Sequence, residues 1–577
     1  MIKKLSKSIR EYKKYAIMTP IFMILEVIME ILIPYLIASL IDKGVTNGDM
    51  SMIIKIGIYL ILCAFLSLTF SIIAGVISSK ASAGFAKNLR HDIYYKIQDY
   101  SFYNIDKFSS SSIVTRLTTD VSNVQMAFMI LIRMAFRAPF TIIFALIMAF
   151  RINKTISLAF LLIIPILGTC LILIAKKAHS YFDKVFKTYD KLNNVVSENV
   201  RGMRVIKSNV IEDREISKFK KVSNEIYKYY TKAEKIIALN SPIMQTIIYS
   251  CILFISYFSA KYITTGIMTT GELTSLITYS LQILMNLMML SMMFVILTIA
   301  GSSGERIVEL LEEIPDLKNN DNPITNVKNG EIEFKDVNFS YAKDTEKLCL
   351  KDINLKINSG ECIGILGGTG SSKTTLVSLI PRLYDVTSGN IYIGNVDVKD
   401  YDLETLRNNV SMVLQKNVLF SGTIKENLRW GNELATEKEI IHACKLAQAD
   451  EFINNFPDKY DTYIEQGGSN VSGGQKQRLC IARALLKKPK ILILDDSTSA
   501  VDTKTDRLIQ EAFKKEIPDV TKIIIAQRVN SIASCDRIII MEDGKINGIG
   551  THDELLKNNA IYKEIYLSQT KGGNINE

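Results

Sequence analysis

The sequence predicts a two-part protein, with an α-helical transmembrane domain of six spans followed by an α/β domain. Three observations indicate this. At 577 residues the chain is long enough for two domains. Long apolar runs are confined to residues 15 to 300, and residues 331 to 577 alternate short apolar strands with glycine turns and polar helices. We place the transmembrane domain at 1–310, a linker at 311–330, the α/β domain at 331–570 and a disordered tail at 571–577.

Each of six apolar segments is long enough to cross a bilayer core, which takes about 20 helical residues. The connections after the second and fourth segments are long and rich in charged residues, and the others are short. Because basic connections stay in the cytoplasm, we expect these two, both termini and the α/β domain on the cytoplasmic side of the plasma membrane. Polar heptad-like stretches at 88–98 and 189–200 predict helices that continue beyond the bilayer. The predicted spans are 15–41, 53–79, 127–151, 156–176, 236–263 and 273–300.

Charged residues inside the predicted spans are costly in hydrocarbon and need an explanation. Glu26 and Glu30 lie one helical turn apart in the first span, and Arg133 and Arg137 lie one turn apart in the third. Two interpretations remain open: the pairs neutralise each other between helices, or the acidic pair lines a path for cationic substrates.

The last span carries methionines at helical spacing, which places them on one face. Methionine is flexible and suits surfaces that accept several apolar ligands, but ordinary packing or lipid contact explains such a face equally well. The residues are Met285, Met288, Met289, Met292 and Met293.

The composition excludes several classes of protein. The net charge of +10 comes from Lys and Arg beside apolar segments, as at the cytoplasmic flanks of membrane helices, so we expect no nucleic-acid partner. The eight cysteines form no CxxC pair and there are only four histidines, which argues against a disulfide framework or a zinc site and for a reducing cytoplasm. The first apolar stretch contains Glu26 and Glu30 and lacks a cleavage site, so it is not a signal peptide.

A phosphate-binding loop follows the apolar strand 363–366. In such a strand–turn–helix, backbone N–H groups bind phosphate oxygens, Lys373 reaches the β- and γ-phosphates and Thr374 ligates Mg²⁺. Ser372 stands where the motif has glycine, and a positive φ there would weaken ATP binding by about 1 kcal/mol or more. The predicted loop residues are Gly367, Gly368, Thr369, Gly370, Ser371, Ser372, Lys373, Thr374 and Thr375.

Further motifs surround this loop in a fixed order. Tyr341 stands in FSY, Gln415 in VLQ, and Asp495 ends the apolar strand ILILD, ahead of which lies the string NVSGGQ at 470–475. Together they resemble the ATP-binding cassette (ABC) ATPases. The resemblance implies that Tyr341 stacks on adenine and that Gln415, Thr374 and Asp495 hold Mg²⁺. It also implies that a helical subdomain presents the signature residues to a γ-phosphate, these being Ser472, Gly473, Gly474 and Gln475.

The resemblance extends over the membrane half. Residues 106–121 and 198–207 resemble the two coupling loops of ABC exporters. A membrane domain with six spans followed by a cassette is similar to the half-transporters of bacterial multidrug and lipid exporters. The implied cofactors are ATP and Mg²⁺, and the implied partners are the lipid bilayer, a second half-transporter and a small hydrophobic or cationic substrate.

Two positions depart from the family pattern. Asp496 stands where the family usually has its catalytic Glu, and Gln527 where it usually has the switch His. Asp496 is one methylene shorter, and poorly placed base catalysis costs about 10²–10⁴-fold in rate. The signature is intact, and in this family it completes the opposite site. The pattern therefore resembles the degenerate-site subunit of a heterodimeric exporter, which binds ATP, hydrolyses it slowly and depends on a non-identical partner.

Alternatives stay open at this point. One is a homodimeric exporter or lipid flippase in which Asp496 is a working base. Another is a peptide exporter, although the leader-cleaving type carries an N-terminal protease domain that this sequence does not show. A regulatory or channel-like ABC protein is the third, and the short linker is unlike the regulatory insertions of those proteins.

Overall fold

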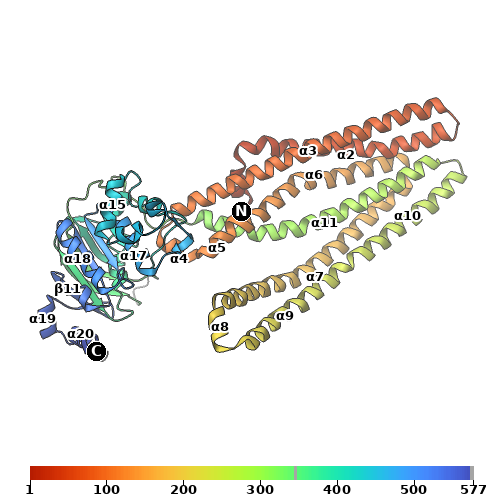
Figure 1. The fold of residues 1–577 in the computed structure, drawn as a ribbon. Coiled ribbons are helices and arrows are strands. Elements are labelled where there is room, and N and C mark those ends of the chain that lie inside the picture. Colours follow the sequence, from red (N-terminus) through yellow and green to blue (C-terminus); the bar gives the residue numbers. More distant parts are fainter. Residues whose placement is uncertain (343–346, 572–577) are drawn as a thin grey trace. The chain divides into compact units, whose positions relative to one another are not determined.

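The computed structural model describes residues 1–342 and 347–571 and divides into two compact units. One unit comprises Met1–Gln98 and Ser109–Glu313, and the other comprises Asp99–Phe108 and Ile314–Glu577. Figure 1 shows long helices in the first unit and a mixture of strands and helices in the second. Of the predicted tail, only Lys571 belongs to the described residues, and it ends a helix.

The first unit is entirely helical, and the described chain has six helical stretches long and apolar enough to cross a membrane, as predicted. These stretches are Ile2–Val45, Met50–Gln98, Ser110–Ile152, Lys154–Arg201, Glu212–Thr264 and Thr270–Glu312. Its helices are α1 (Ile2–Leu5), η1 (Ser6–Tyr12), α2 (Lys13–Ser39), η2 (Leu40–Val45), α3 (Met50–Gln98), α5 (Ser110–Thr115), η3 (Arg116–Asp120), α6 (Val121–Ile152), α7 (Lys154–Arg201), α8 (Met203–Asn209), α9 (Glu212–Ala238), α10 (Asn240–Thr264) and α11 (Thr270–Glu312).

Several of these helices are much longer than a bilayer is thick. Helix α3 has 49 residues and α7 has 48. At 1.5 Å per residue each is about 70 Å long, more than twice the hydrocarbon thickness of about 30 Å. The predicted continuation of both helices through 88–98 and 189–200 is therefore confirmed. Figure 1 shows α7 and α9 side by side, joined by α8 at their far end.

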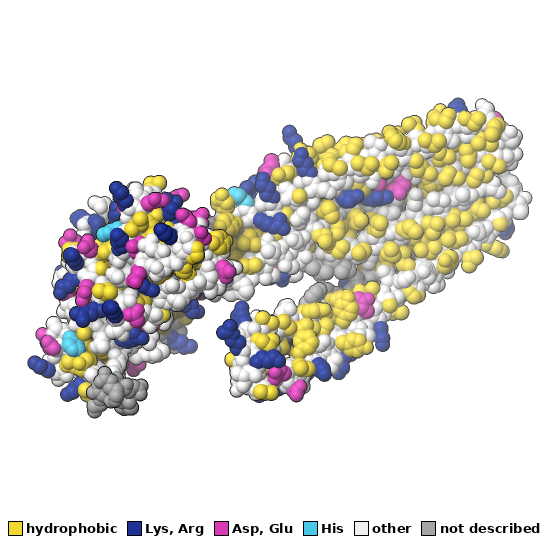
Figure 2. Space-filling model, in the orientation of Figure 1, with side chains coloured by type: hydrophobic (Ala, Val, Ile, Leu, Met, Phe, Trp, Pro, Cys, Tyr) yellow, Lys and Arg dark blue, Asp and Glu magenta, His cyan; other side chains and the backbone are white. Residues whose placement is uncertain are grey.

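The bundle holds together through a small buried core and leaves an apolar exterior. Val27, Ile31, Phe160 and Tyr279 belong to one cluster of buried residues, and the Tyr279 hydroxyl donates to the Ile31 carbonyl at 2.9 Å. Large apolar side chains along α3 are exposed in the single chain, as expected for a surface solvated by lipid. Figure 2 shows hydrophobic side chains spread along the visible face of the long helices, with few charged side chains among them.

The intramembrane charges join α2 to α6. Arg137 donates from Nη1 to Glu26 Oε1 and from Nη2 to Glu30 Oε2, both at 3.0 Å. The Glu26 side chain is only 5% exposed, so this bridge compensates a buried carboxylate. Mutual neutralisation thus accounts for both glutamates. Arg133 is half-buried, and no ion pair is found for it among the described residues.

Removing the bridging arginine is expected to destabilise the membrane unit. Arg137→Gln leaves two carboxylates without their cation, and breaking one partner of such a buried set costs about 3 kcal/mol or more. The midpoint for loss of monodisperse protein on heating in detergent should fall clearly. Arg133→Gln, one turn away, is the matched control and should change it little. Equal midpoints for the two variants would contradict the bridging role.

The methionine face is mostly on the surface of the single chain. Met285, Met288, Met289 and Met292 are between 41% and 68% exposed, whereas Met293 is 7% exposed. Packing against the chain's own helices therefore accounts only for Met293. The other four are available to lipid, substrate or a second subunit.

Within its described residues, the second unit contains three sheets. The largest has the order β12-β11-β3-β10-β9-β6 and is parallel except at β12, the second has the order β2-β1-β4-β5 and is antiparallel, and β7 pairs with β8. The strands are β1 (Ile332–Phe339), β2 (Leu350–Ile357), β3 (Cys362–Gly367), β4 (Ser388–Ile393), β5 (Val396–Asp397), β6 (Val410–Val413), β7 (Gly422–Thr423), β8 (Tyr463–Ile464), β9 (Ile491–Asp495), β10 (Thr521–Ile525), β11 (Arg537–Glu542) and β12 (Lys545–Gly550).

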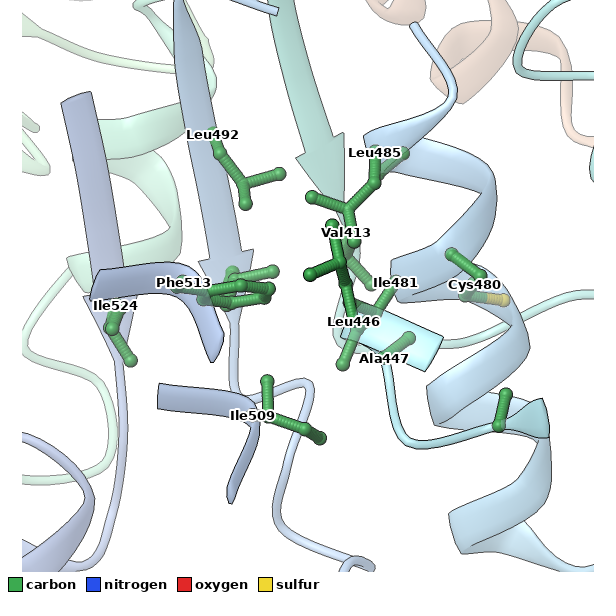
Figure 3. Packing of buried hydrophobic residues seen from close by; sticks show 14 of the residues in the cluster. Val413, Leu446, Ala447, Cys480, Ile481, Leu485, Leu492, Ile509, Phe513 and Ile524 are labelled. Carbon is green, nitrogen blue, oxygen red and sulfur yellow. The ribbon is translucent and has the colours of Figure 1, made fainter. Parts of the chain in front are cut away.

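Helices cover the six-stranded sheet. Figure 3 shows Ile481 and Leu485 of α17 and Phe513 of α18 packed against side chains of the strands. Strands β9 and β10 are buried along their whole length, and most of their residues are apolar, as in ILIL of β9 and III of β10. The helices are α4 (Phe102–Phe108), α12 (Lys373–Ser378), α13 (Leu403–Asn409), α14 (Ile424–Arg429), α15 (Glu437–Leu446), α16 (Asp450–Asn454), η4 (Lys459–Asp461), η5 (Gln466–Gly468), α17 (Gly473–Leu485), α18 (Thr503–Glu516), η6 (Val529–Ser531), α19 (His552–Asn558) and α20 (Ala560–Lys571).

The first predicted coupling loop is split between the two units. Its early part, α4, belongs to the second unit, where the Tyr384 hydroxyl donates to Asp106 Oδ2 at 3.1 Å and the Phe102 and Tyr384 rings lie 6.0 Å apart. Its later part, from Thr115 to Val121, belongs to the helical unit. The polar contacts of α4 thus attach this short segment to the α/β unit.

Candidate functional site

The phosphate-binding loop lies at the carboxyl end of a central strand. Strand β3 has parallel neighbours on both sides, β10 and β11, and the chain turns from Gly367 into α12. Ligands of open α/β sheets bind at this edge, outside the carboxyl ends of the strands. A side chain at Gly367 would collide with the Met541 carbonyl, so this close approach requires glycine.

Lys373 lies folded into the loop that it follows. Its Nζ donates to the carbonyls of Gly367 at 2.8 Å and Gly368 at 2.7 Å and contacts Ser371 Oγ at 3.2 Å. Burial lowers the pKa of the Lys373 ammonium, and the carboxylates of Asp495 and Asp496 oppose that shift. The charge is therefore held inside the concavity formed by the loop, where phosphate oxygens would meet it.

Ser372 has a left-handed backbone conformation, which settles the sign of φ that the sequence alone did not specify. Its φ is +68° and its ψ is 26°, at the N-cap of α12. A residue with a Cβ pays roughly 1–2 kcal/mol for this conformation relative to the right-handed one, whereas glycine adopts it freely. The departure from the motif is thus a real backbone cost at the phosphate loop.

Ser372→Gly is expected to relieve this strain. The ATP-loaded protein should gain about 1 kcal/mol, which corresponds to a thermal midpoint about 2–4 °C higher. The chain has one tryptophan, Trp430, which stacks on Phe420 in the α/β unit, so its fluorescence reports unfolding of that unit. Ser371→Gly is the matched control. Ser371 lacks a positive φ and its hydroxyl contacts Gly368 and Lys373, so this variant should lose stability. The same sign for both variants would contradict the argument.

The residues predicted to hold Mg²⁺ are suited to it. Thr374 Oγ1 donates to Asp495 Oδ1 at 3.1 Å, and Asp495 is 1% exposed. Its other oxygen, Oδ2, is buried with no hydrogen-bond partner among the described residues. Burial raises the pKa of Asp495, and the Thr374 hydrogen bond partly offsets this. A hydroxyl and a carboxylate with a spare oxygen are hard ligands, which Mg²⁺ prefers together with nucleotide phosphates.

Asp496 and Gln527 are in direct contact. Asp495 at the end of β9 is in register with Ile525 at the end of β10, so the residues just beyond the two strands lie side by side. Gln527 Nε2 donates to Asp496 Oδ2 at 2.8 Å. Asp496 has φ of +48°, a conformation that Asp tolerates better than most residues. Burial raises its pKa, and hydrogen bonds from Gln415 and Gln527 oppose this.

Tyr341 lies beside the phosphate-binding loop. Its hydroxyl is 3.1 Å from Thr375 Oγ1, and its ring meets those of Phe339 and Tyr384 edge-on at 4.8 and 5.1 Å between centroids. The side chain remains 39% exposed. The loop, Gln415, Asp495, Asp496 and Gln527 lie at or just beyond the carboxyl ends of β3, β6, β9 and β10, at one edge of the six-stranded sheet. Tyr341 follows β1 of the antiparallel sheet and meets the loop through Thr375.

The signature residues lie at the start of α17 and not in the phosphate-binding loop. Ser472 is the N-cap of α17 and forms a capping box with Gln475: Ser472 Oγ accepts from the Gln475 N–H at 3.2 Å, and the Gln475 side chain accepts from the Ser472 N–H at 2.9 Å. Ser472 and Gly473 are exposed at this helix end. Within the described part of the chain, no hydrogen bond joins them to the phosphate-binding loop.

Gln477 is a residue that the sequence reasoning missed. It is 6% exposed, and its side chain reaches the segment after Asp496: Oε1 accepts from the Ala500 N–H at 3.0 Å and Nε2 donates to Ser499 Oγ at 3.3 Å. It therefore ties the signature helix to the chain that follows β9. The available signal was a polar side chain one turn before the buried Ile481, on the apolar face of α17.

The comparisons with known proteins agree with this arrangement. Residues 16–288 match the family described as ABC transporter transmembrane region, and residues 350–499 match the family described as ABC transporter. An uncharacterized ABC transporter ATP-binding protein of Bacillus subtilis, YfiB, is 36% identical over 568 residues and 98% of each chain. A putative multidrug export ATP-binding/permease protein of the same organism, YgaD, is 30% identical over 99% of each chain.

Two further relatives extend the comparison. An ATP-dependent lipid A-core flippase of Desulfotalea psychrophila is 31% identical over 536 residues and 93% of each chain. The solved structure of a bacterial Atm1-family ABC exporter with ATP bound superposes with a TM-score of 0.85, covering 97% of this chain and 99% of that one. At 22% identity this last likeness concerns the fold alone.

A membrane domain of six spans fused to a P-loop cassette with its own signature helix defines a membrane-bound transport ATPase. The chain belongs to the ABC transporter family, as a half-transporter that joins one membrane domain to one cassette. It is a multi-pass membrane protein whose ATP hydrolysis is coupled to transport.

Proposed function

We propose that this half-transporter works with a second, non-identical half to drive the efflux of small hydrophobic or amphipathic molecules. Its cassette faces the cytoplasm and the membrane is the plasma membrane. ATP and Mg²⁺ are held by Tyr341, the 367–375 loop, Gln415 and Asp495, and Ser472 to Gln475 serve the partner's ATP. Its own site binds ATP and hydrolyses it slowly.

One observation carries the proposal: the contact between Asp496 and Gln527. A general base must lie within reach of the proton that it removes, and small misplacements cost large factors in rate. The shorter Asp496 carboxylate accepts a hydrogen bond from the Gln527 side-chain amide at 2.8 Å, which engages one of its oxygens. Glutamine can donate a hydrogen bond to phosphate but carries no charge. Both changes lower turnover, whereas the groups for binding ATP remain.

The intact capping box supports the other half of the proposal. Ser472 and Gln475 organise the N-terminus of α17, where amide groups and the helix dipole favour an anion. In this family the signature of one cassette closes over the ATP bound to the other. A chain whose own ATP site is impaired at 496 and 527, but whose signature is ordered, is therefore suited to complete a competent site on a different subunit.

The substrate class rests on the membrane unit and the relatives. Four methionines of α11 are exposed in the single chain, and flexible thioethers adapt to apolar ligands of different shape. One relative is named as a putative multidrug exporter and another as a lipid A-core flippase. Amphipathic molecules are common to both descriptions.

The test is ATP turnover with and without the partner. Purified alone, the chain should hydrolyse ATP slowly, because both sites of a homodimer would contain Asp496 and Gln527. Co-purified with the partner half, it should give a 1:1 complex whose turnover is about 10²-fold higher or more.

The control is the single chain carrying Asp496→Glu and Gln527→His together. If slow turnover reflects these two residues, the double variant should gain activity without the partner. Fast turnover by the unmodified single chain would overturn the heterodimer and favour a homodimeric exporter or flippase with Asp496 as the base.

A further inference from the structure

Two cysteines far apart in the sequence meet at one edge of the large sheet. Cys362 is the first residue of β3, and Cys535 lies two residues before β11 begins. Their Sγ atoms are 3.2 Å apart, across 173 positions of sequence. The backbone beside them is fixed on both sides: the Asp536 N–H donates to the Cys362 carbonyl at 2.9 Å, and Asp536 Oδ2 accepts from the Cys362 N–H at 2.8 Å.

The surroundings make the two thiols unequal. Cys362 is half-buried, whereas Cys535 is 7% exposed. The hydrogen bond between the two thiols runs from Cys362 Sγ to Cys535 Sγ. This contact lowers the pKa of Cys362, and the Lys522 ammonium adds to the shift. Lys522 lies beside Cys362 in the sheet, since the two residues are register partners of β10 and β3. The same hydrogen bond raises the pKa of Cys535. Cys362 is thus the less buried thiol and the one with the lowered pKa, and Cys535 is the more buried thiol beside it.

The pair is distinct among the cysteines that the structure describes. No other two of them lie within hydrogen-bond reach of each other. Cys251 contacts Ser280 and Cys480 contacts the Val418 carbonyl. Cys349 is half-buried, like Cys362, but has no thiol beside it among the described residues. It therefore serves as an internal comparison.

We propose that Cys362 and Cys535 form a redox modification site that a small disulfide such as oxidised glutathione converts into an intrachain disulfide. The Cys362 thiolate attacks one sulfur of the reagent, forms a mixed disulfide and releases one small thiolate. Cys535, after losing its proton, attacks Cys362 Sγ and releases the second small thiol. The two protein thiols are oxidised and the reagent is reduced to two thiols, so the exchange balances.

The geometry allows the bond with little movement. A disulfide holds its sulfurs about 2.05 Å apart, so the Sγ atoms must approach by about 1.2 Å, which side-chain rotation can supply. The pair is at the amino-terminal edge of the sheet. The phosphate-binding loop is at the opposite edge, five residues along β3, or about 16 Å away at 3.3 Å per residue. Closing the bond should therefore leave ATP binding unchanged.

The disulfide should raise the stability of the cassette. The bond would close a loop that contains the phosphate-binding loop, the signature helix and both altered catalytic positions. A cross-link over so long a loop restricts the unfolded chain strongly. In a reducing cytoplasm the thiols stay reduced, and the bond forms when small disulfides accumulate. The site thus strengthens the cassette under oxidising conditions.

The experiment uses the full-length protein in detergent, treated with oxidised glutathione and then digested after free thiols are alkylated. Mass spectrometry should find a peptide that links Cys362 to Cys535 and is lighter by two hydrogens, with Cys349 alkylated. Trp430-detected unfolding should shift upward by about 5–10 °C, and dithiothreitol should reverse both changes. ATP affinity should stay within about twofold of the reduced protein.

Three variants sharpen the result. Cys535→Ser should keep a glutathione adduct on Cys362, because the second thiol is missing. In Cys362→Ser, the remaining Cys535 should carry no adduct. Cys349→Ser should behave as the unmodified chain. A permanent adduct on Cys362 of the unmodified chain, a link to any other cysteine, or full alkylation of both residues would overturn the proposal. Peptide mapping of the unmodified chain decides the question even if a variant fails to fold.

Discussion

Glutamine in place of the partner's catalytic glutamate, the counterpart of Asp496, is expected to lower ATP turnover of the proposed two-chain transporter by about 10²–10⁴-fold. Asp496→Asn in this chain should lower it by less than about threefold, since a base that already contributes little is being removed. The asymmetry follows from the geometry at 496, where the short carboxylate accepts a hydrogen bond from Gln527 at 2.8 Å. Steady-state phosphate release from the co-purified pair measures both variants.

A second variant of this chain separates its two roles. Ser472→Ala removes the hydroxyl that caps α17 and that, in this family, faces the partner's γ-phosphate. Loss of an N-cap costs about 1 kcal/mol in stability, but loss of a phosphate contact in the competent site should cost turnover as well. We therefore expect Ser472→Ala to reduce phosphate release by about tenfold or more, well beyond Asp496→Asn. Thr423→Ala, which removes the cap of α14, is the matched control for the loss of a cap alone.

The opposite ranking would reverse the assignment of roles. If Asp496→Asn alone stopped the complex, this chain would carry the working base. The intact signature would then complete an ATP site on the partner that hydrolyses ATP more slowly.

Local patterns predicted the architecture well, because the signals were contained in single segments. Six apolar runs became six membrane helices, and the strand–glycine–helix pattern at Gly367 became the loop after β3. The altered residues were visible for the same reason. Each departs from a motif whose other positions are occupied as expected.

What the sequence left open depends on how distant segments meet. The φ of Ser372 is set by the turn that directs α12 away from β3, and no local pattern specifies its sign. Glu26 and Glu30 were paired with two arginines, but one guanidinium, that of Arg137, serves both. The contact between Asp496 and Gln527 spans 31 positions and follows from the register of β9 and β10. Cys362 and Cys535 were considered scattered for the same reason.

The site of this chain is expected to retain its ATP while the partner's site turns over. Lys373, Thr374 and Asp495 are placed at the loop, and Gln415 lies beside Asp496, so we expect nucleotide to bind but to be consumed slowly. A bound nucleotide that favours the closed pair of cassettes shifts their equilibrium by its differential affinity for that state. During steady transport one ATP per heterodimer should stay intact over many cycles, and about one should be hydrolysed per cycle rather than two.

Lys373→Ala tests whether that retained ATP acts as a clamp. The variant removes the ammonium that donates to the Gly367 and Gly368 carbonyls in the loop, and loss of a charged phosphate contact costs about 1.5–3 kcal/mol of binding. We expect retained ATP to disappear and the fraction of closed cassettes to fall by about tenfold or more. Chemistry at the partner's site, measured in a single turnover of the residual closed complexes, should change far less. Rapid filtration with labelled ATP measures retention, and cross-linking across the cassettes measures closure. Fast, equal exchange at both sites in the unmodified complex would rule out the clamp, and closure that persists in Lys373→Ala despite lost retention would show that this ATP does not hold the cassettes together.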